Sequence, residues 1–103
     1  MNSIKFAIEK TEEFERWLSH QDDGIKKAAD DRFVKITNYG YFGDHRKLIT
    51  KGNFWELRWQ NGLRFYYAYL PKQHILVLLG GTKHGQEKDI KRLQKIYTTF
   101  MRT

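Results

Sequence analysis

Two arginines, Arg58 and Arg64, lie close together in the stretch "WELRWQNGLRFYY" (residues 55–67). The alternation of apolar and polar side chains around an Asn-Gly pair is typical of two strands joined by a tight turn. A guanidinium group presents paired N–H donors that match the oxygens of a phosphate. Two such groups side by side on rigid strands would form a preorganised phosphate site, provided that the turn places them on one face.

The length of the turn decides on which faces the arginines lie. A two-residue turn of Asn61 and Gly62 would pair Arg58 with Phe65 and mix charged and apolar side chains on both faces. A three-residue turn, with Gly62 in the left-handed conformation of a bulge, pairs Arg58 with Arg64 instead. We expect the three-residue turn, because burying each large apolar side chain is worth about 1.5–3 kcal/mol and this register gathers them on one face. That face holds Trp55, Leu57, Trp59, Leu63, Phe65 and Tyr67, and the other holds Glu56, Arg58, Arg64, Tyr66 and Ala68.

Glu56 shares the predicted arginine face and offers a purely structural explanation, since it could neutralise the two like charges. Neighbouring segments, however, add four more basic residues and few acids, so one glutamate cannot balance the set. These residues are Arg46, Lys47, Lys51 and Lys83. We therefore favour a phosphate-binding role for the arginine pair.

The charge of the chain is unevenly distributed. Its 103 residues, 40% of them hydrophobic, suffice for one domain spanning residues 1–103 and carry a formal net charge of +7. Residues 1–38 contribute −1 and residues 39–103 contribute +8. This asymmetry favours a polyanionic partner, nucleic acid before membrane, over a basic surface that merely aids solubility.

Several kinds of site are not expected from the composition. The chain has no cysteine, and its four histidines show no metal-ligand spacing, so we expect neither a metal site nor another cofactor. No apolar run reaches the roughly 18 residues that a membrane span needs, and the N-terminus lacks the layout of a signal peptide. We expect a soluble, cytoplasmic protein without a membrane partner.

The N-terminal part of the chain predicts one strand and a helical hairpin. Residues 3–8 alternate as a half-buried strand does, with Ile4 on its apolar side. Thr11 can cap a first helix, and Asp22 or Asp23 starts a second helix with an apolar stripe at spacings of three and four. The second helix should end before "NYGYFGD" (residues 38–44), because Asn and Gly break helices.

From residue 46 the apolar period changes to two, which predicts four more strands at residues 46–50, 54–60, 63–70 and 74–81. The last of these is nearly all aliphatic and should be central, covered on both faces. A closing helix follows "GGTKHG", with Lys88 among its polar residues. The order β-α-α-β-β-β-β-α predicts an α+β fold in which helices pack on one twisted, mostly antiparallel sheet, with Tyr67 and Tyr69 in the core.

The stretches "GDHRKLITKGNFWELRWQNGLRFYYAY" and "ILVLLGGTKHGQEKDIKR" resemble the HigB-like, phage Gp49-like branch of the RelE/ParE toxin superfamily of type II toxin-antitoxin modules. The resemblance covers residues 4 to about 97. It implies a RelE-like fold and a ribosome-dependent ribonuclease that cuts mRNA in the ribosomal A site. It also implies inhibition by a HigA-like helix-turn-helix antitoxin encoded beside the toxin.

Carried over by position, the resemblance marks the basic strand residue, the two arginines and the segment after the last strand. The matching positions are Arg46 or Lys47, Arg58, Arg64, Lys83, Gln86 and Asp89. Two adjacent basic residues stand where the family has one, so either can point into the site. His84 stands where the family more often has a small polar residue.

RNA can be cut without a metal if its 2′-hydroxyl attacks the adjacent phosphate, which needs a base, a cationic stabiliser and an acid. Arg58 and Arg64 suit the stabilising role, and His84, beside Lys83, is the candidate for proton transfer. His45 is a second candidate, whereas His20 and His74 suit structural roles. Lys51, Lys83 and Lys88 could hold phosphates, and Tyr66 could stack on a base.

Two other functions agree with the same residues. A related toxin could inhibit DNA gyrase by binding, although such an inhibitor does not need a phosphate clamp. A non-catalytic RNA- or ribosome-binding module explains the charge equally well and would bind RNA with salt dependence but without turnover.

Overall fold

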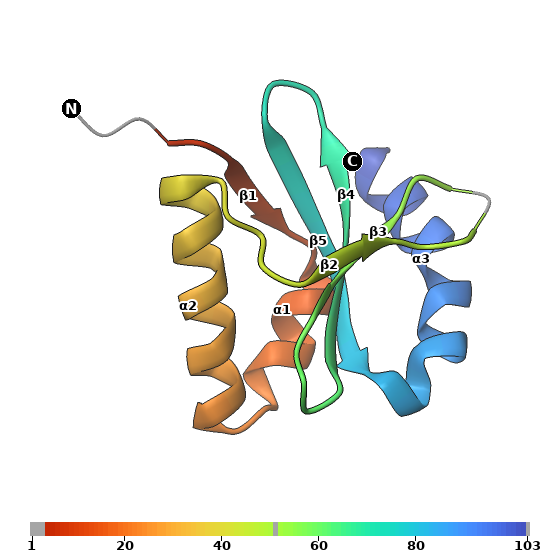
Figure 1. Cartoon of the computed structure of the whole chain (residues 1–103). Coiled ribbons are helices and arrows are strands. Elements are labelled where there is room, and N and C mark those ends of the chain that lie inside the picture. Colours follow the sequence, from red (N-terminus) through yellow and green to blue (C-terminus); the bar gives the residue numbers. More distant parts are fainter. Residues whose placement is uncertain (1–3, 51, 103) are drawn as a thin grey trace.

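The computed structural model describes residues 4–50 and 52–102, in which a five-stranded sheet lies between two layers of helices (Figure 1). The strands are β1 (Ala7–Lys10), β2 (His45–Lys47), β3 (Trp55–Arg58), β4 (Leu63–Leu70) and β5 (His74–Thr82). The helices are α1 (Glu12–Ser19), α2 (Asp23–Tyr39) and α3 (Gln86–Met101), with a 3₁₀ turn, η1 (Lys83–Gly85), before α3. The element order agrees with the prediction.

The strands lie in the order β1-β5-β4-β3-β2. Strands β2 to β5 form an antiparallel meander, and β1 pairs with β5 in parallel. Strand β5 therefore has neighbours on both edges, and its residues Ile75 to Gly81 are buried. The prediction of a central, doubly covered last strand is confirmed.

Each face of the sheet has its own apolar core. On one face, Phe14 of α1 and Phe33 of α2 pack against Leu57, Phe65 and Tyr67 of the sheet. On the other face, α3 contributes two buried residues, Leu93 and Ile96, which pack against Tyr66, Leu76 and Leu78. Figure 1 shows α1 and α2 on one side of the sheet and α3 on the other. The sheet therefore separates two apolar cores and contributes side chains to both.

Two adjacent glycines of β5 let these layers approach closely. A Cβ at Gly80 would overlap the ring of Trp17 from α1, and a Cβ at Gly81 would overlap the carboxylate of Asp89 from α3. Neighbouring residues of a strand face opposite sides. The pair therefore opens one space on each face, for an aromatic ring on one and for a carboxylate on the other.

The predicted helix starts are confirmed, but the end of α2 is not where the sequence placed it. The side chains of Thr11 and Asp22 accept hydrogen bonds from the backbone N–H groups of Phe14 and Ile25. Helix α2 runs on through Asn38 to Tyr39 and is capped by Gly40, which has a left-handed φ of 66°. The stop before residue 38 was wrong, because a single Asn is tolerated in a helix until a glycine allows the left-handed cap.

Three strand predictions were also inexact. Strand β1 begins at Ala7, and Ile4, expected on the buried side, is 66% exposed. Strand β2 ends at Lys47, short of residue 50, and Leu48 beyond it is buried in the core under α3. Tyr69 was expected in the core but is 42% exposed, because its ring lies at the margin of the aromatic cluster on the α1 and α2 side.

Candidate functional site

The hairpin of β3 and β4 brings the two arginines together. Arg58 and Arg64 are directly opposite each other in the ladder. The backbone N–H of Trp59 donates to the carbonyl oxygen of Leu63 at 3.1 Å, and Gly62 has a φ of 95°. The three-residue turn and the division of the hairpin into an apolar and an arginine face are confirmed.

Neither arginine is fully satisfied by the protein. Arg64 is 9% exposed, and its Nη1 donates to the carbonyl oxygens of Trp59 and Leu63, both at 2.9 Å. The Nε atoms of both Arg58 and Arg64 are buried, and neither makes a hydrogen bond within residues 4–50 and 52–102. Buried charged donors without a partner are rare in folded proteins. The two guanidinium groups therefore keep hydrogen-bonding capacity that the described part of the chain does not use.

Glu56 forms the centre of the site. Its carboxylate is fully buried and accepts from Arg46 Nε at 2.8 Å and from Gln86 Nε2 at 2.6 Å. The Arg58 Nε lies 3.8 Å both from Glu56 Oε1 and from Asp44 Oδ2, too far for a hydrogen bond. Glu56 is thus a counter-ion, as the structural explanation required, but chiefly for Arg46. Among the described residues it is the one buried carboxylate, and it lies within 4 Å of two guanidinium groups, those of Arg46 and Arg58.

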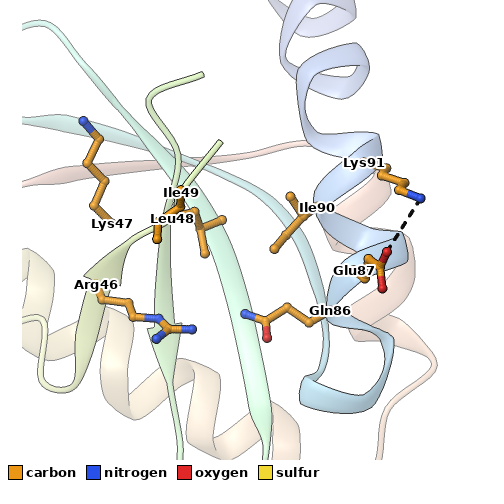
Figure 2. A pocket seen from close by; sticks show the side chains of 8 residues that line it. All are labelled: Arg46, Lys47, Leu48, Ile49, Gln86, Glu87, Ile90 and Lys91. Carbon is orange, nitrogen blue, oxygen red and sulfur yellow. Dashed lines mark ion pairs between the residues drawn. The ribbon is translucent and has the colours of Figure 1, made fainter. Parts of the chain in front are cut away.

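Register also separates the two basic residues of β2. Arg46 pairs with Glu56, and Lys47 pairs with Trp55. Because facing residues share a side of the sheet, Arg46 lies on the arginine face and Lys47 on the face toward α1 and α2. Figure 2 likewise shows Lys47 pointing away from Gln86 and Arg46 pointing toward it. Of the two residues, Arg46 is the one brought to the arginine pair.

The segment after β5 reaches the same hairpin. The backbone N–H of Lys83 donates to the carbonyl oxygen of Gly62 at 2.8 Å, and the Lys83 side chain lies against Gly62. Lys83 and His84 are both exposed on η1. Lys88 is exposed on α3, next to Asp89, and Lys51 lies outside the described residues. The structure therefore brings Lys83 beside the arginine hairpin and leaves Lys88 on the helix surface.

The prediction that Tyr66 stacks on a base was wrong. Tyr66 is fully buried, because α3 covers this part of the arginine face, which the sequence suggested would be open. Burial, together with the nearby carboxylates of Asp89 and Glu56, raises the pKa of Tyr66, and Arg64 partly offsets this. Its hydroxyl has no hydrogen-bond partner in the described part of the chain. Tyr66 is a neutral core residue beneath the site.

Asp89 comes close to this buried region from α3. Its carboxylate sits over Gly81, which pairs with Arg64 in the ladder. Burial raises the pKa of Asp89, and Arg92 and Lys88 oppose that rise. The Gly81 gap therefore holds an acidic group near the arginine pair.

The histidines other than His84 lie away from the arginine pair. His45 pairs with Leu57 and contacts the rings of Phe42 and Trp55, so it lies on the face opposite the arginines. His20 bonds the carbonyl oxygen of Arg16 at the end of α1, and His74 lies 2.9 Å from a carboxylate oxygen of Glu9. Within the described ranges, no three His, Cys, Asp or Glu side chains are grouped so as to hold a metal ion.

Arg32 of α2 supports the site and was missed in the sequence. Its guanidinium donates to the carbonyl oxygens of Phe42 and Arg58, both at 3.0 Å, and lies 4.0 Å from the ring centroid of Trp59. Burial lowers its pKa, and Asp44 opposes the change. A signal was present, because residue 32 falls within the stripe of buried positions between Ala28 and Ile36.

The family model "Phage derived protein Gp49-like (DUF891)" matches residues 16–101. The chain belongs to the Gp49-like family. Gp49-like proteins are toxins of toxin-antitoxin modules, of the RelE/HigB-like kind, and the family implies an antitoxin as partner. An uncharacterized protein of Haemophilus influenzae is 38% identical over 92 residues, which cover 86% of this chain and 90% of the relative. None of the described helices is long and apolar enough to cross a membrane.

Proposed function

We propose that this Gp49-like protein is a metal-independent endoribonuclease that cuts mRNA on the ribosome and thereby stops translation in the cytoplasm. The observation that carries the proposal is the directly opposed pair Arg58 and Arg64, with the half-exposed Arg46 on the same face of the sheet. A phosphate offers oxygens that match the paired donors of a guanidinium group, and its negative charge offsets the local excess of guanidinium groups.

The reaction is an internal transesterification. The 2′-oxygen of one nucleotide forms a bond to the adjacent phosphorus, and the bond from phosphorus to the 5′-oxygen of the next nucleotide breaks. One proton leaves the 2′-hydroxyl and one reaches the departing 5′-oxygen, so the products are a 2′,3′-cyclic phosphate and a 5′-hydroxyl. Negative charge builds up on the non-bridging oxygens as the phosphorus becomes pentacoordinate, and rigid donors aimed there lower the barrier.

Each residue around the hairpin has a separate role in the proposed reaction. Arg58 and Arg64 bind the phosphate and stabilise its developing charge. Lys83, tied through its backbone to Gly62 in the hairpin turn, adds positive charge at the rim. His84 follows it on η1, where it is exposed, and exchanges a proton with the RNA, because an imidazole ring can serve as a general acid or base. Arg46 orients the neighbouring part of the RNA, and Lys88 attracts the backbone from α3.

Control of the activity belongs to the cognate antitoxin. The family implies such a partner, and we propose a HigA-like helix-turn-helix protein encoded beside the toxin gene. Formation of the complex is expected to silence the ribonuclease.

The test is expression of the toxin in growing cells, with translation rate and transcript ends measured together. The proposal predicts arrest of translation and mRNA fragments with 5′-hydroxyl ends. Replacing both Arg58 and Arg64 with alanine should abolish both effects. Arg58→Lys keeps the charge but loses the paired donors, and it should lower the cleavage rate by about a hundredfold.

The matched control is Arg16→Ala, which removes an exposed arginine from α1 on the opposite side of the sheet and should cleave like the unmodified protein. Since Arg64 is nearly buried, each variant is first checked for an unchanged circular dichroism spectrum. Growth arrest with intact mRNA would overturn the proposal. A supercoiling assay with purified gyrase would then identify a gyrase inhibitor, and salt-dependent RNA binding without turnover would identify a binding module.

A further inference from the structure

A groove runs between the chain after β2 and the first turns of α3, beside the arginine site. It has a volume of about 460 Å³, which is within the range of sites for small ligands. Figure 2 shows Leu48 and Ile49 on one side of the groove and Ile90 of α3 on the other. Ile49 is fully exposed to solvent although its side chain is aliphatic. The groove therefore presents apolar walls that a flat, apolar surface can cover.

The polar groups of the groove are held in place by Glu56. Arg46 and Gln86 both donate to its buried carboxylate, at 2.8 Å and 2.6 Å, and they point toward one another in Figure 2. The bond from Arg46 uses Nε, so its two terminal nitrogens remain as a paired donor edge on a side chain that is 55% exposed. The buried carboxylate of Glu56 thus orients the half-exposed Arg46 at the margin of the apolar groove.

We propose that this groove binds a guanine base of the RNA, next to the phosphate held by Arg58 and Arg64; the inference rests on the function proposed above. Aliphatic walls suit the faces of a flat base, and the paired donors of arginine match O6 and N7 of guanine. Adenine has an amino donor in place of O6 and is rejected.

The groove and the arginine pair lie next to each other, because one oxygen of Glu56 is near both Arg46 and Arg58. Glu56 Oε1 lies 2.8 Å from Arg46 Nε and 3.8 Å from Arg58 Nε. A base against Arg46 and a phosphate against Arg58 are therefore neighbours, as they are along one RNA strand. The groove selects which phosphate lies at the arginine pair.

The test measures binding by the purified protein, so that it does not depend on cleavage. Fluorescent 2′-O-methyl oligouridine hexamers, which cannot be cut, carry one central guanine, adenine, inosine or 7-deazaguanine. The guanine hexamer should bind about tenfold more tightly than the adenine hexamer. Inosine keeps O6 and N7 and should bind like guanine, whereas 7-deazaguanine lacks N7 and should bind more weakly.

Arg46→Lys should abolish the guanine preference, because lysine keeps the charge and loses the paired donors. Ile49→Ala removes an exposed wall without disturbing the core and should weaken guanine binding. Lys35→Gln, which removes an exposed charge from α2 across the sheet, is the control and should keep the preference.

Guanine and adenine hexamers that bind within twofold of each other, or a preference that survives Arg46→Lys, would overturn the inference. Cleavage without base preference would leave the ribonuclease proposal standing and remove this one. A guanine preference without cleavage in cells would do the reverse.

Discussion

Replacing Glu56 with glutamine removes one negative charge from the centre of the site and keeps the shape of the side chain. The carboxylate uses both oxygens, one toward Arg46 and one toward Gln86. An amide has one acceptor oxygen and one NH₂ group, so one of the two donors then faces another donor. Because residue 56 is fully buried, water cannot reach its amide NH₂ to relieve the contact between two donors.

The expected loss of stability follows from these contacts. An unmatched buried donor costs about 1–3 kcal/mol, and replacing a charge-assisted hydrogen bond with a weaker one costs about 1 kcal/mol more. Arg46 is 55% exposed and can turn toward water, which places the sum near the lower end, at about 2 kcal/mol. For a domain of this size, that loss lowers the melting temperature by about 8–16 °C.

The assay is thermal unfolding followed by circular dichroism, with a compensating variant. Exchanging the two groups, as Glu56→Gln with Gln86→Glu, again gives each donor an acceptor, because the amide NH₂ of residue 56 then donates to the carboxylate of residue 86. The double variant should recover at least half of the lost stability. Glu87→Gln is the control, since this neighbour of Gln86 is 90% exposed and should melt like the unmodified protein.

A Glu56→Gln variant that melts within about 2 °C of the unmodified protein would refute the reasoning, because the carboxylate would then not hold the two donors. So would a double variant no more stable than the single one. Either result would also remove the support that orients Arg46 in the groove.

Two further predictions concern the close contacts of β5. Gly80→Ala should lower the free energy of unfolding by about 1–3 kcal/mol in urea titrations, because its Cβ would meet the rigid ring of Trp17; an unchanged midpoint would contradict this. Asp89→Asn should gain stability relative to the unmodified protein as pH rises. The raised pKa of Asp89 means that its contribution to stability is complete below its ordinary value of 3.8 and is lost as pH rises through the folded value, whereas asparagine does not titrate. The difference in urea midpoint between about pH 3 and pH 7 measures this effect, and a difference that stays constant over that range would count against it.

Local sequence patterns predicted much of the fold. The alternation of β3 and β4 with Gly62 between them predicted the register, because only one turn length separates apolar from charged side chains. Thr11 predicted the start of α1, and Asp22 or Asp23 that of α2; the side chains of Thr11 and Asp22 accept from N–H groups three residues ahead. These features depend on residues that are close in the chain, and they can therefore be predicted without the tertiary structure.

Other features depend on residues far apart in the chain. The sequence predicted which residues face each other on the hairpin but not that α3 would cover that face, which buries Tyr66 and turns an expected base-stacking residue into core. Arg32 joins α2 to the carbonyl of Arg58, a contact across 26 positions that no local period encodes.

By itself, then, the sequence determined the order of elements, the hairpin register and the pairing of Arg58 with Arg64, because short-range sterics and periodic burial control these. Only the tertiary structure decided that Arg46, and not Lys47, joins the arginine pair, and that Glu56, which also accepts from Gln86, holds it there. The reason is physical. A buried carboxylate is stable only where donors from separate elements meet around it, and the packing of the whole chain decides where they meet.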